Sequence, residues 1–89
     1  MTAHLIRYWI EFEKKGEQLP AGTQLGVGVT AAGRADALAL VRERVFDGEL
    51  PTIENITEGV DVSTLDKGHV LPNMEPPVYR GIWFPRGYS

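Results

Sequence analysis

Side chains able to carry out acid-base or nucleophilic chemistry gather in one short stretch of the chain. Asp61, Ser63, Asp66 and His69 lie within nine residues, and together they supply a nucleophile, a base and an orienting carboxylate. They could serve a small hydrolase or another acid-base enzyme. However, catalytic groups usually meet from separate parts of a fold, whereas aspartate and serine this close together favour turns and helix caps. We therefore favour a capped turn and keep catalysis by His69 as the alternative.

Metal and cofactor chemistry has little support in the sequence. The chain has no cysteine and only two histidines, His4 and His69, without the close spacing typical of metal ligands. Gly26-Val27-Gly28 begins like a dinucleotide-binding loop, but the position of the third glycine is Ala31 and the glycines alternate with strand-forming residues. We expect no cofactor and no metal, and we expect a tryptophan to pack over these glycines.

Aromatic side chains and a proline-rich stretch indicate a binding surface instead. Large aromatics and arginine dominate binding energy at protein interfaces, and the three prolines of residues 69–77 fix an extended loop at low entropy. Two simpler interpretations stay open: Trp9 and Trp83 could pack against each other across adjacent strands, and the loop could be only a rigid crossover. The predicted interaction surface comprises Trp9, Leu71, Asn73, Met74, Tyr79, Arg80 and Trp83.

Four extended segments and one helix must position these residues. Alternating apolar residues predict strands over His4–Glu13, Gln24–Thr30 and Val78–Phe84, and a less regular strand, either at a sheet edge or bent near Gly59, over residues 52–62. Helical spacing over Ala32–Phe46 predicts a helix.

The predicted helix carries an apolar stripe of Ala35, Leu38, Val41 and Val45. With 89 residues the chain has room for one domain and one core. The economical arrangement is an α+β fold with two layers: a mostly antiparallel sheet of about four strands with the helix on one face, in the order β-β-α-β-β.

Charge and hydropathy narrow the classes of partner. A net charge of −3 and a pI near 5.3 disfavour nucleic acid and anionic lipid. Single-stranded nucleic-acid binding therefore stays a second alternative, and it requires arginines beside Trp9 or Trp83. No stretch reads as a signal peptide or approaches the roughly 20 apolar residues of a membrane span, so we expect a cytoplasmic protein without a membrane partner.

Three segments carry a resemblance: Asp61-Val-Ser-Thr-Leu-Asp66, Leu71-Pro-Asn-Met74 and Gly81-Ile-Trp-Phe-Pro85. The chain resembles a family of small uncharacterised bacterial proteins of about this length. The resemblance implies a bacterial origin and brings no activity, ligand or catalytic residue with it. From the residues themselves we predict a non-enzymatic module that binds a protein partner, either another protein or a second copy of the chain.

Overall fold

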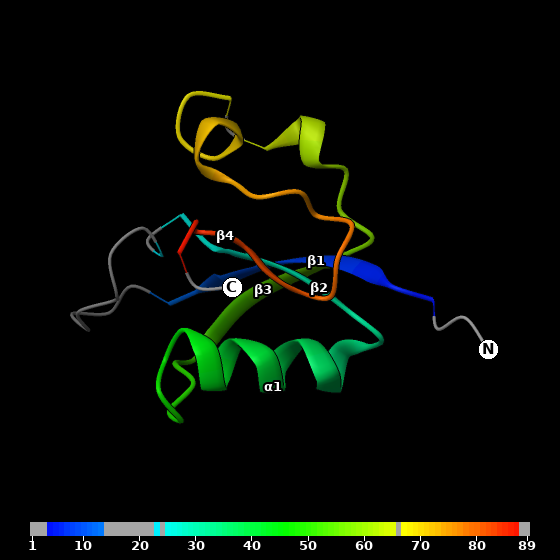
Figure 1. Ribbon diagram of the computed structural model, residues 1–89. Helices are drawn as coiled ribbons and strands as arrows, with labels where there is room; N and C mark the ends of the chain where they lie inside the picture. The colour runs from blue at the N-terminus through cyan, green and yellow to red at the C-terminus, as the bar shows by residue number, and fades with distance from the viewer. Residues whose placement is uncertain (1–3, 14–22, 24, 66, 88–89) are drawn as a thin grey trace.

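The structure is a computed structural model that describes residues 4–13, 23, 25–65 and 67–87. Its elements are β1 (Ile6–Phe12), β2 (Val27–Ala31), α1 (Arg34–Arg44), β3 (Ile53–Glu58) and β4 (Gly81–Phe84). The strands form one antiparallel sheet in the order β3-β1-β2-β4, with α1 across one face (Figure 1). This confirms the predicted α+β fold and its element order.

The face of the sheet that contacts α1 carries the larger core. The alternating side chains of β1 point into it as predicted, with Tyr8, Ile10 and Phe12 almost fully buried. Val27 and Val29 of β2 join them. Because burying one large apolar side chain stabilises a fold by about 1.5–3 kcal/mol, this cluster is the main source of stability.

Helix α1 is shorter than predicted, and it buries a different stripe. It begins after Gly33 and buries Ala37, Leu40 and Val41, whereas Ala35 is exposed. Residues spaced by three and four stay on one side of a helix, but Ala35 and Val41, six apart, lie about 120° from each other around the axis. The predicted stripe therefore does not keep to one side of the helix. Ala35 was wrongly assigned to the buried side, and Leu38 is only partly buried.

Two glycines of the second strand region make room for both tryptophans, whereas the sequence predicted that one tryptophan would pack over them. A Cβ on Gly26 would lie 2.6 Å from Trp9 Cζ2, and one on Gly28 would lie 2.4 Å from Trp83 Cζ3. The indole rings of Trp9 and Trp83 pack with centroids 6.1 Å apart. The predicted contact is therefore real, but the strands are not adjacent: β2 runs between β1 and β4, and the rings meet because Gly28 has no side chain between them.

The other face of the sheet is covered by residues 60–65 and 67–76, which contain only two one-turn 3₁₀ helices, Val62–Thr64 and Leu71–Asn73 (Figure 1). This covering layer was not predicted. Its Val60 and Val70 form a second core cluster with Trp9, Trp83 and Phe84. Trp83 and Phe84 are consecutive yet share this cluster, because the β2–β4 register shifts between Gly28 and Val29 and such a bulge redirects side chains.

Strand β3 is an edge strand, as predicted, and the chain turns at Gly59, where φ is +68°. Ile53 and Ile56 pack against the helix-side core. Val60 and Val62 have the even spacing from Ile56 that would keep them on its face of an uninterrupted strand, but they lie with the second cluster. The left-handed residue Gly59 lets the chain cross from one face of the sheet to the other.

Candidate functional site

Residues 75–80, here called the β4 loop, lead into β4 and are anchored to three elements. Thr30 Oγ1 on β2 donates a 2.6 Å hydrogen bond to the carbonyl of Pro77. The Glu75 N–H donates to the carbonyl of Trp83 at 2.8 Å. Arg80 donates through Nε to Asp36 Oδ2 at 2.9 Å and through Nη2 to Oδ1. The loop is therefore held in place although it has no regular secondary structure.

The β4 loop carries the two most exposed large apolar side chains that the structure describes. Val78 is 60% exposed and Tyr79 is 74% exposed. The sequence predicted a strand from Val78, but β4 begins only at Gly81, where φ is +142°. Arg80 turns to α1 to meet Asp36, so residues 78–80 leave the extended path and project Val78 and Tyr79 outward.

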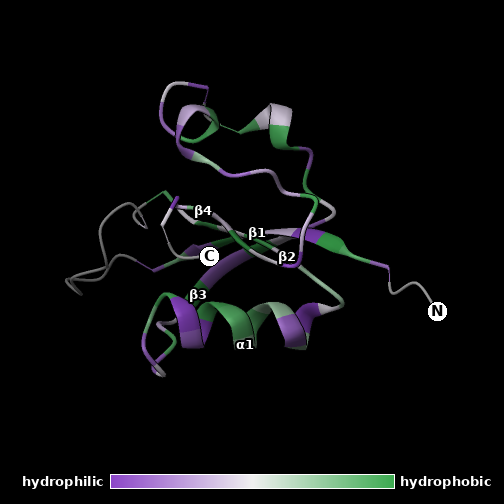
Figure 2. Ribbon diagram, viewed as in Figure 1, coloured by the Kyte–Doolittle hydropathy of each residue, from purple (hydrophilic) through white to green (hydrophobic). Residues whose placement is uncertain are grey.

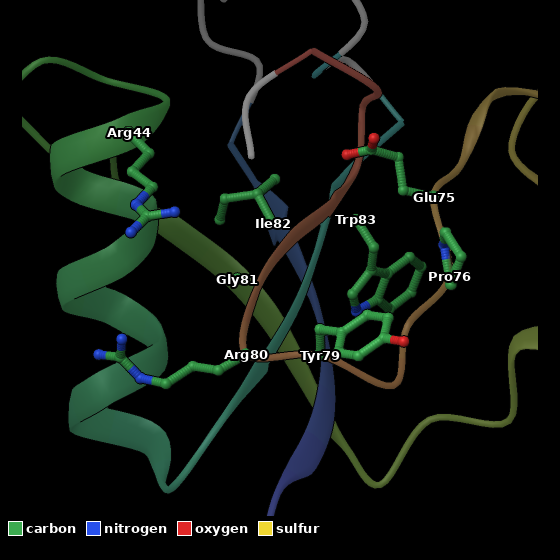
Figure 3. Close-up of a pocket in the computed structure, with 8 residues that line it drawn as sticks. All are labelled: Arg44, Glu75, Pro76, Tyr79, Arg80, Gly81, Ile82 and Trp83. Atoms are coloured by element: carbon green, nitrogen blue, oxygen red, sulfur yellow. The ribbon is translucent and has the colours of Figure 1, made fainter.

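A pocket lies on each side of this projection. The Leu5 pocket, of about 230 Å³, is lined by Leu5, Arg7, Thr30, Pro77 and Val78. The β4 pocket, of about 240 Å³, is lined by Arg44 and by residues 75, 76 and 79–83 (Figure 3). Leu5 is itself 43% exposed. Leu5, Val78 and Tyr79 are together called the tip surface, and sequence reasoning found only Tyr79 of these three.

The cations around the tip surface are arginines with different partners. Arg80 is neutralised by Asp36, and hydrogen bonds from Arg80 and from the Ala32 N–H lower the pKa of Asp36 to about 2. Arg7 in the Leu5 pocket and Arg44 in the β4 pocket make no ion pair within the described part of the chain. Glu75 also lines the β4 pocket, so the two arginines without an ion pair, Arg7 and Arg44, share the surroundings of the tip surface with one carboxylate.

One buried polar atom in the β4 pocket is left without a partner. Trp83 is 1% exposed, and its indole Nε1–H donates no hydrogen bond to any described residue. Figure 3 shows this nitrogen on the edge of the indole that lies beside the Tyr79 ring. A buried donor left unsatisfied costs about 1–3 kcal/mol, so this atom has an unmet requirement for an acceptor.

The residues of the predicted interaction surface have separate positions in the structure. Tyr79 and Arg80 lie in the β4 loop, but Trp9 and Trp83 are buried and offer no ring face to solvent. Met74 packs on the second core cluster, and Leu71 is half-buried.

Asn73 is exposed but bonded within the chain. Its side-chain Nδ2 donates to the carbonyl of His69, and its own carbonyl accepts from the Arg86 N–H. The proline-rich stretch thus covers one face of the sheet, and it exposes little of the predicted interaction surface.

Two residues of the acid-base cluster, Asp61 and Ser63, form the cap of a 3₁₀ turn. Asp61 Oδ1 accepts from the Ser63 N–H at 3.0 Å and from Ser63 Oγ at 2.7 Å, at the start of the Val62–Thr64 turn. These bonds, led by that from the Ser63 hydroxyl, lower the pKa of Asp61, which makes it a weaker base. His69 is exposed and lines neither pocket. Asp66 lies outside the described residues.

The described residues were also compared with the requirements of a metal site and of a membrane span. No group of three or more His, Cys, Asp or Glu side chains among them is arranged to hold a metal ion. Within the same residues, no helix combines the length and apolar character needed to cross a membrane.

Comparison with known proteins adds no family. No protein-family model, curated protein or solved structure matches the chain. The case for function therefore rests on the β4 loop and its two pockets.

Proposed function

We propose that the chain is a non-enzymatic protein-interaction module whose docking site is the tip surface. The observation that carries this proposal is the exposure of Val78 and Tyr79, at 60% and 74%, on a loop anchored to β2, β4 and α1. Exposed apolar side chains on a rigid support are suited to binding, because little conformational entropy is lost when they are covered. Tyrosine is also among the residues enriched at binding hot spots.

The charges beside the tip surface support one kind of partner. Arg7 and Arg44 line the two flanking pockets without an ion pair among the described residues. Charge complementarity across an interface favours an acidic partner here and disfavours a basic one. We therefore assign the partner as a segment of another protein that carries apolar and acidic side chains.

The burial of both tryptophans supports protein binding over the alternatives. Single-stranded nucleic acid needs exposed ring faces on which bases stack, and Trp9 and Trp83 contact each other and the glycines of β2. A hydrolase would need Ser63 beside a histidine base, whereas the Ser63 hydroxyl donates to Asp61.

Selection from a displayed library of random peptides, followed by titration calorimetry with the enriched peptides, tests the proposal. Tyr79→Ser should weaken binding by about 30-fold, because loss of an interface anchor costs about 2 kcal/mol or more. Leu25→Ser is the matched control: Leu25 is also exposed, at 41%, but precedes β2 at the end remote from Thr30. It should leave the affinity unchanged.

Two results would oppose the proposal. Peptides that bind the wild type and Tyr79→Ser equally well would show that another surface binds. Sedimentation at several concentrations would reveal self-association, and a dimer that persists in Tyr79→Ser would place the interface elsewhere. A dimer that dissociates in this variant would support the tip surface as the interface and would identify the partner as a second copy of the chain.

A further inference from the structure

The β4 pocket is lined by two residues with hydrogen-bond donors available to a ligand, the exposed guanidinium of Arg44 and the buried indole N–H of Trp83. Arg44 extends from the last turn of α1 until Nη1 is 3.9 Å from the position of a Cβ on Gly81, and it makes no ion pair within the described residues. Trp83 Nε1 is buried and unpartnered there. Figure 3 shows the guanidinium on the α1 side of β4 and the indole on the other side. A ligand that satisfies both must therefore have two separate acceptor groups.

The remaining charges of the pocket decide which acceptor goes where. Arg80 is already paired with Asp36, so Arg44 is the cation of this pocket that has no ion pair among the described residues. Glu75 lines the pocket on the same side of β4 as Trp83 in Figure 3. Because like charges repel, a carboxylate is favoured beside Arg44 and a neutral carbonyl beside Trp83.

We propose that the β4 pocket binds an acidic residue of the partner peptide, with its side-chain carboxylate on Arg44 and a neighbouring main-chain carbonyl on Trp83 Nε1. The volume of about 240 Å³ has room for one such residue. This inference rests on the proposed function for the source of the ligand. It adds what that function does not specify, which is the chemistry that selects the partner.

Tyr79 connects the pocket to the tip surface. Its ring lies beside the indole nitrogen in Figure 3, it is exposed, and it makes no hydrogen bond to a described residue. Tyr79 lines the β4 pocket together with Trp83, so a change of its side-chain rotamer, of the kind common at interfaces on binding, would open the approach to Nε1 from this side. Docking of an apolar side chain against Tyr79 and capture of the adjacent acidic residue are therefore parts of one binding event.

The direct probe is glutamate blocked at both ends, N-acetylglutamate N-methylamide, which carries one carboxylate and two amide carbonyls. The chain has two tryptophans, so an ¹⁵N-labelled sample gives two indole N–H signals. Blocked glutamate should shift the Trp83 signal downfield in a saturable way at constant ionic strength and leave the Trp9 signal in place. Blocked glutamine is the uncharged match, and it should bind about tenfold more weakly, because it lacks the charge-assisted hydrogen bond.

Three variants separate the two contacts. Arg44→Gln should remove the preference for blocked glutamate over blocked glutamine. Trp83→Phe should weaken the binding of both ligands, because it removes the donor and keeps an aromatic ring. Arg42→Gln is the control on the same helix: Arg42 is exposed, lies beside Glu43 and does not line the pocket. It should bind as the wild type does, and dispersed amide spectra confirm that each variant is folded.

The outcomes separate this inference from the proposed function. Absence of a saturable shift of the Trp83 signal, or equal binding of both ligands by the wild type, overturns the pocket assignment. Selected peptides could depend on Tyr79 but keep their affinity for Arg44→Gln and after their own acidic residues are replaced by amides. This result would support the protein-interaction module and refute the binding of an acidic residue in the β4 pocket. If blocked glutamate binds as described but no peptide does, the β4 pocket is supported as a site for a small acid and the proposal of a protein partner is refuted.

Discussion

At the scale of single residues, Gly28 has more influence on this fold than its lack of a side chain suggests. It lies opposite Trp9 on one side and Phe84 on the other, and the Trp83 ring occupies the space where its Cβ would be. The alternation of Gly26 and Gly28 with valines predicted such a contact. It could not predict that both tryptophans would be buried, because the sequence gives no sign of the layer that covers them.

Gly28→Ala should destabilise the protein by about 1–3 kcal/mol, the usual cost of overpacking a core. A Cβ at this position would be 2.4 Å from Trp83 Cζ3, so the ring must move. Gly33→Ala is the matched control, because it has nothing within 4 Å and an extended φ of −176°. Since Gly33 is the N-cap of α1, where alanine is less favourable than glycine, this variant should lose at most about 1 kcal/mol. Urea unfolding compares the two, and equal stabilities would refute the account of the packing.

The ion pair between Asp36 and Arg80 predicts a pH dependence. The pKa of Asp36 is lowered from 3.8 to about 2, first by the hydrogen bond from Arg80. Since the folded-state pKa lies below the unfolded value, the pair stabilises the fold above about pH 4 and this contribution is lost as the pH falls towards 2. NMR titration of the Asp36 carboxyl should give a midpoint near 2. In Arg80→Gln the midpoint should rise towards 3.8, and an unchanged midpoint would remove Arg80 as the cause.

At the scale of elements, the β4 loop is ordered by its anchors. Thr30 is 2% exposed and sends its hydroxyl to the Pro77 carbonyl, while the Glu75 N–H bonds to Trp83. Hydropathy patterns cannot predict such bonds, since they join residues far apart in sequence through single atoms. For the same reason the strand predicted from the sequence began at Val78, whereas β4 begins at Gly81.

Thr30→Val tests whether the anchor orders the loop. Valine keeps the shape of threonine but removes the donor, so the Pro77 carbonyl loses its partner at a cost of about 1–3 kcal/mol. Amide hydrogen exchange at Glu75 should become faster, because the loop opens more often. Thr57→Val on the exposed strand β3 is the control and should leave this exchange rate unchanged. Equal rates at Glu75 in both variants would mean that the hydroxyl does not hold the loop.

At the scale of the whole molecule, the two edges of the sheet differ. The outer edge of β4 is partly covered, since the Glu75 N–H bonds to the Trp83 carbonyl and the Asn73 carbonyl accepts from Arg86. Among the described residues, none pairs with the outer edge of β3. Figure 2 shows β3 as mostly hydrophilic, and its Glu54 and Glu58 place charge on this edge, which protects an edge from pairing with other chains.

The features that could be predicted from the sequence are those that depend on interactions between residues close together in the chain. Local periodicity predicted the element order and the buried side chains of β1, because these depend on near neighbours. The covering layer could not be predicted, since residues 60–65 and 67–76 have little regular structure and are held by contacts with Trp9, Trp83 and Phe84. Val78 and Leu5 were missed for a related reason: their exposure depends on how the β4 loop meets the end of β1.

The measurement that tests the central claim most directly is an amide chemical-shift map of a selected peptide bound to ¹⁵N-labelled protein. The proposed docking site predicts perturbations at residues 5–7 and 77–83, together with the Trp83 indole N–H. Binding by addition of a strand to the open sheet edge would instead perturb residues 53–58 of β3. A map centred on β3, with the β4 loop unchanged, would contradict the assignment of the tip surface.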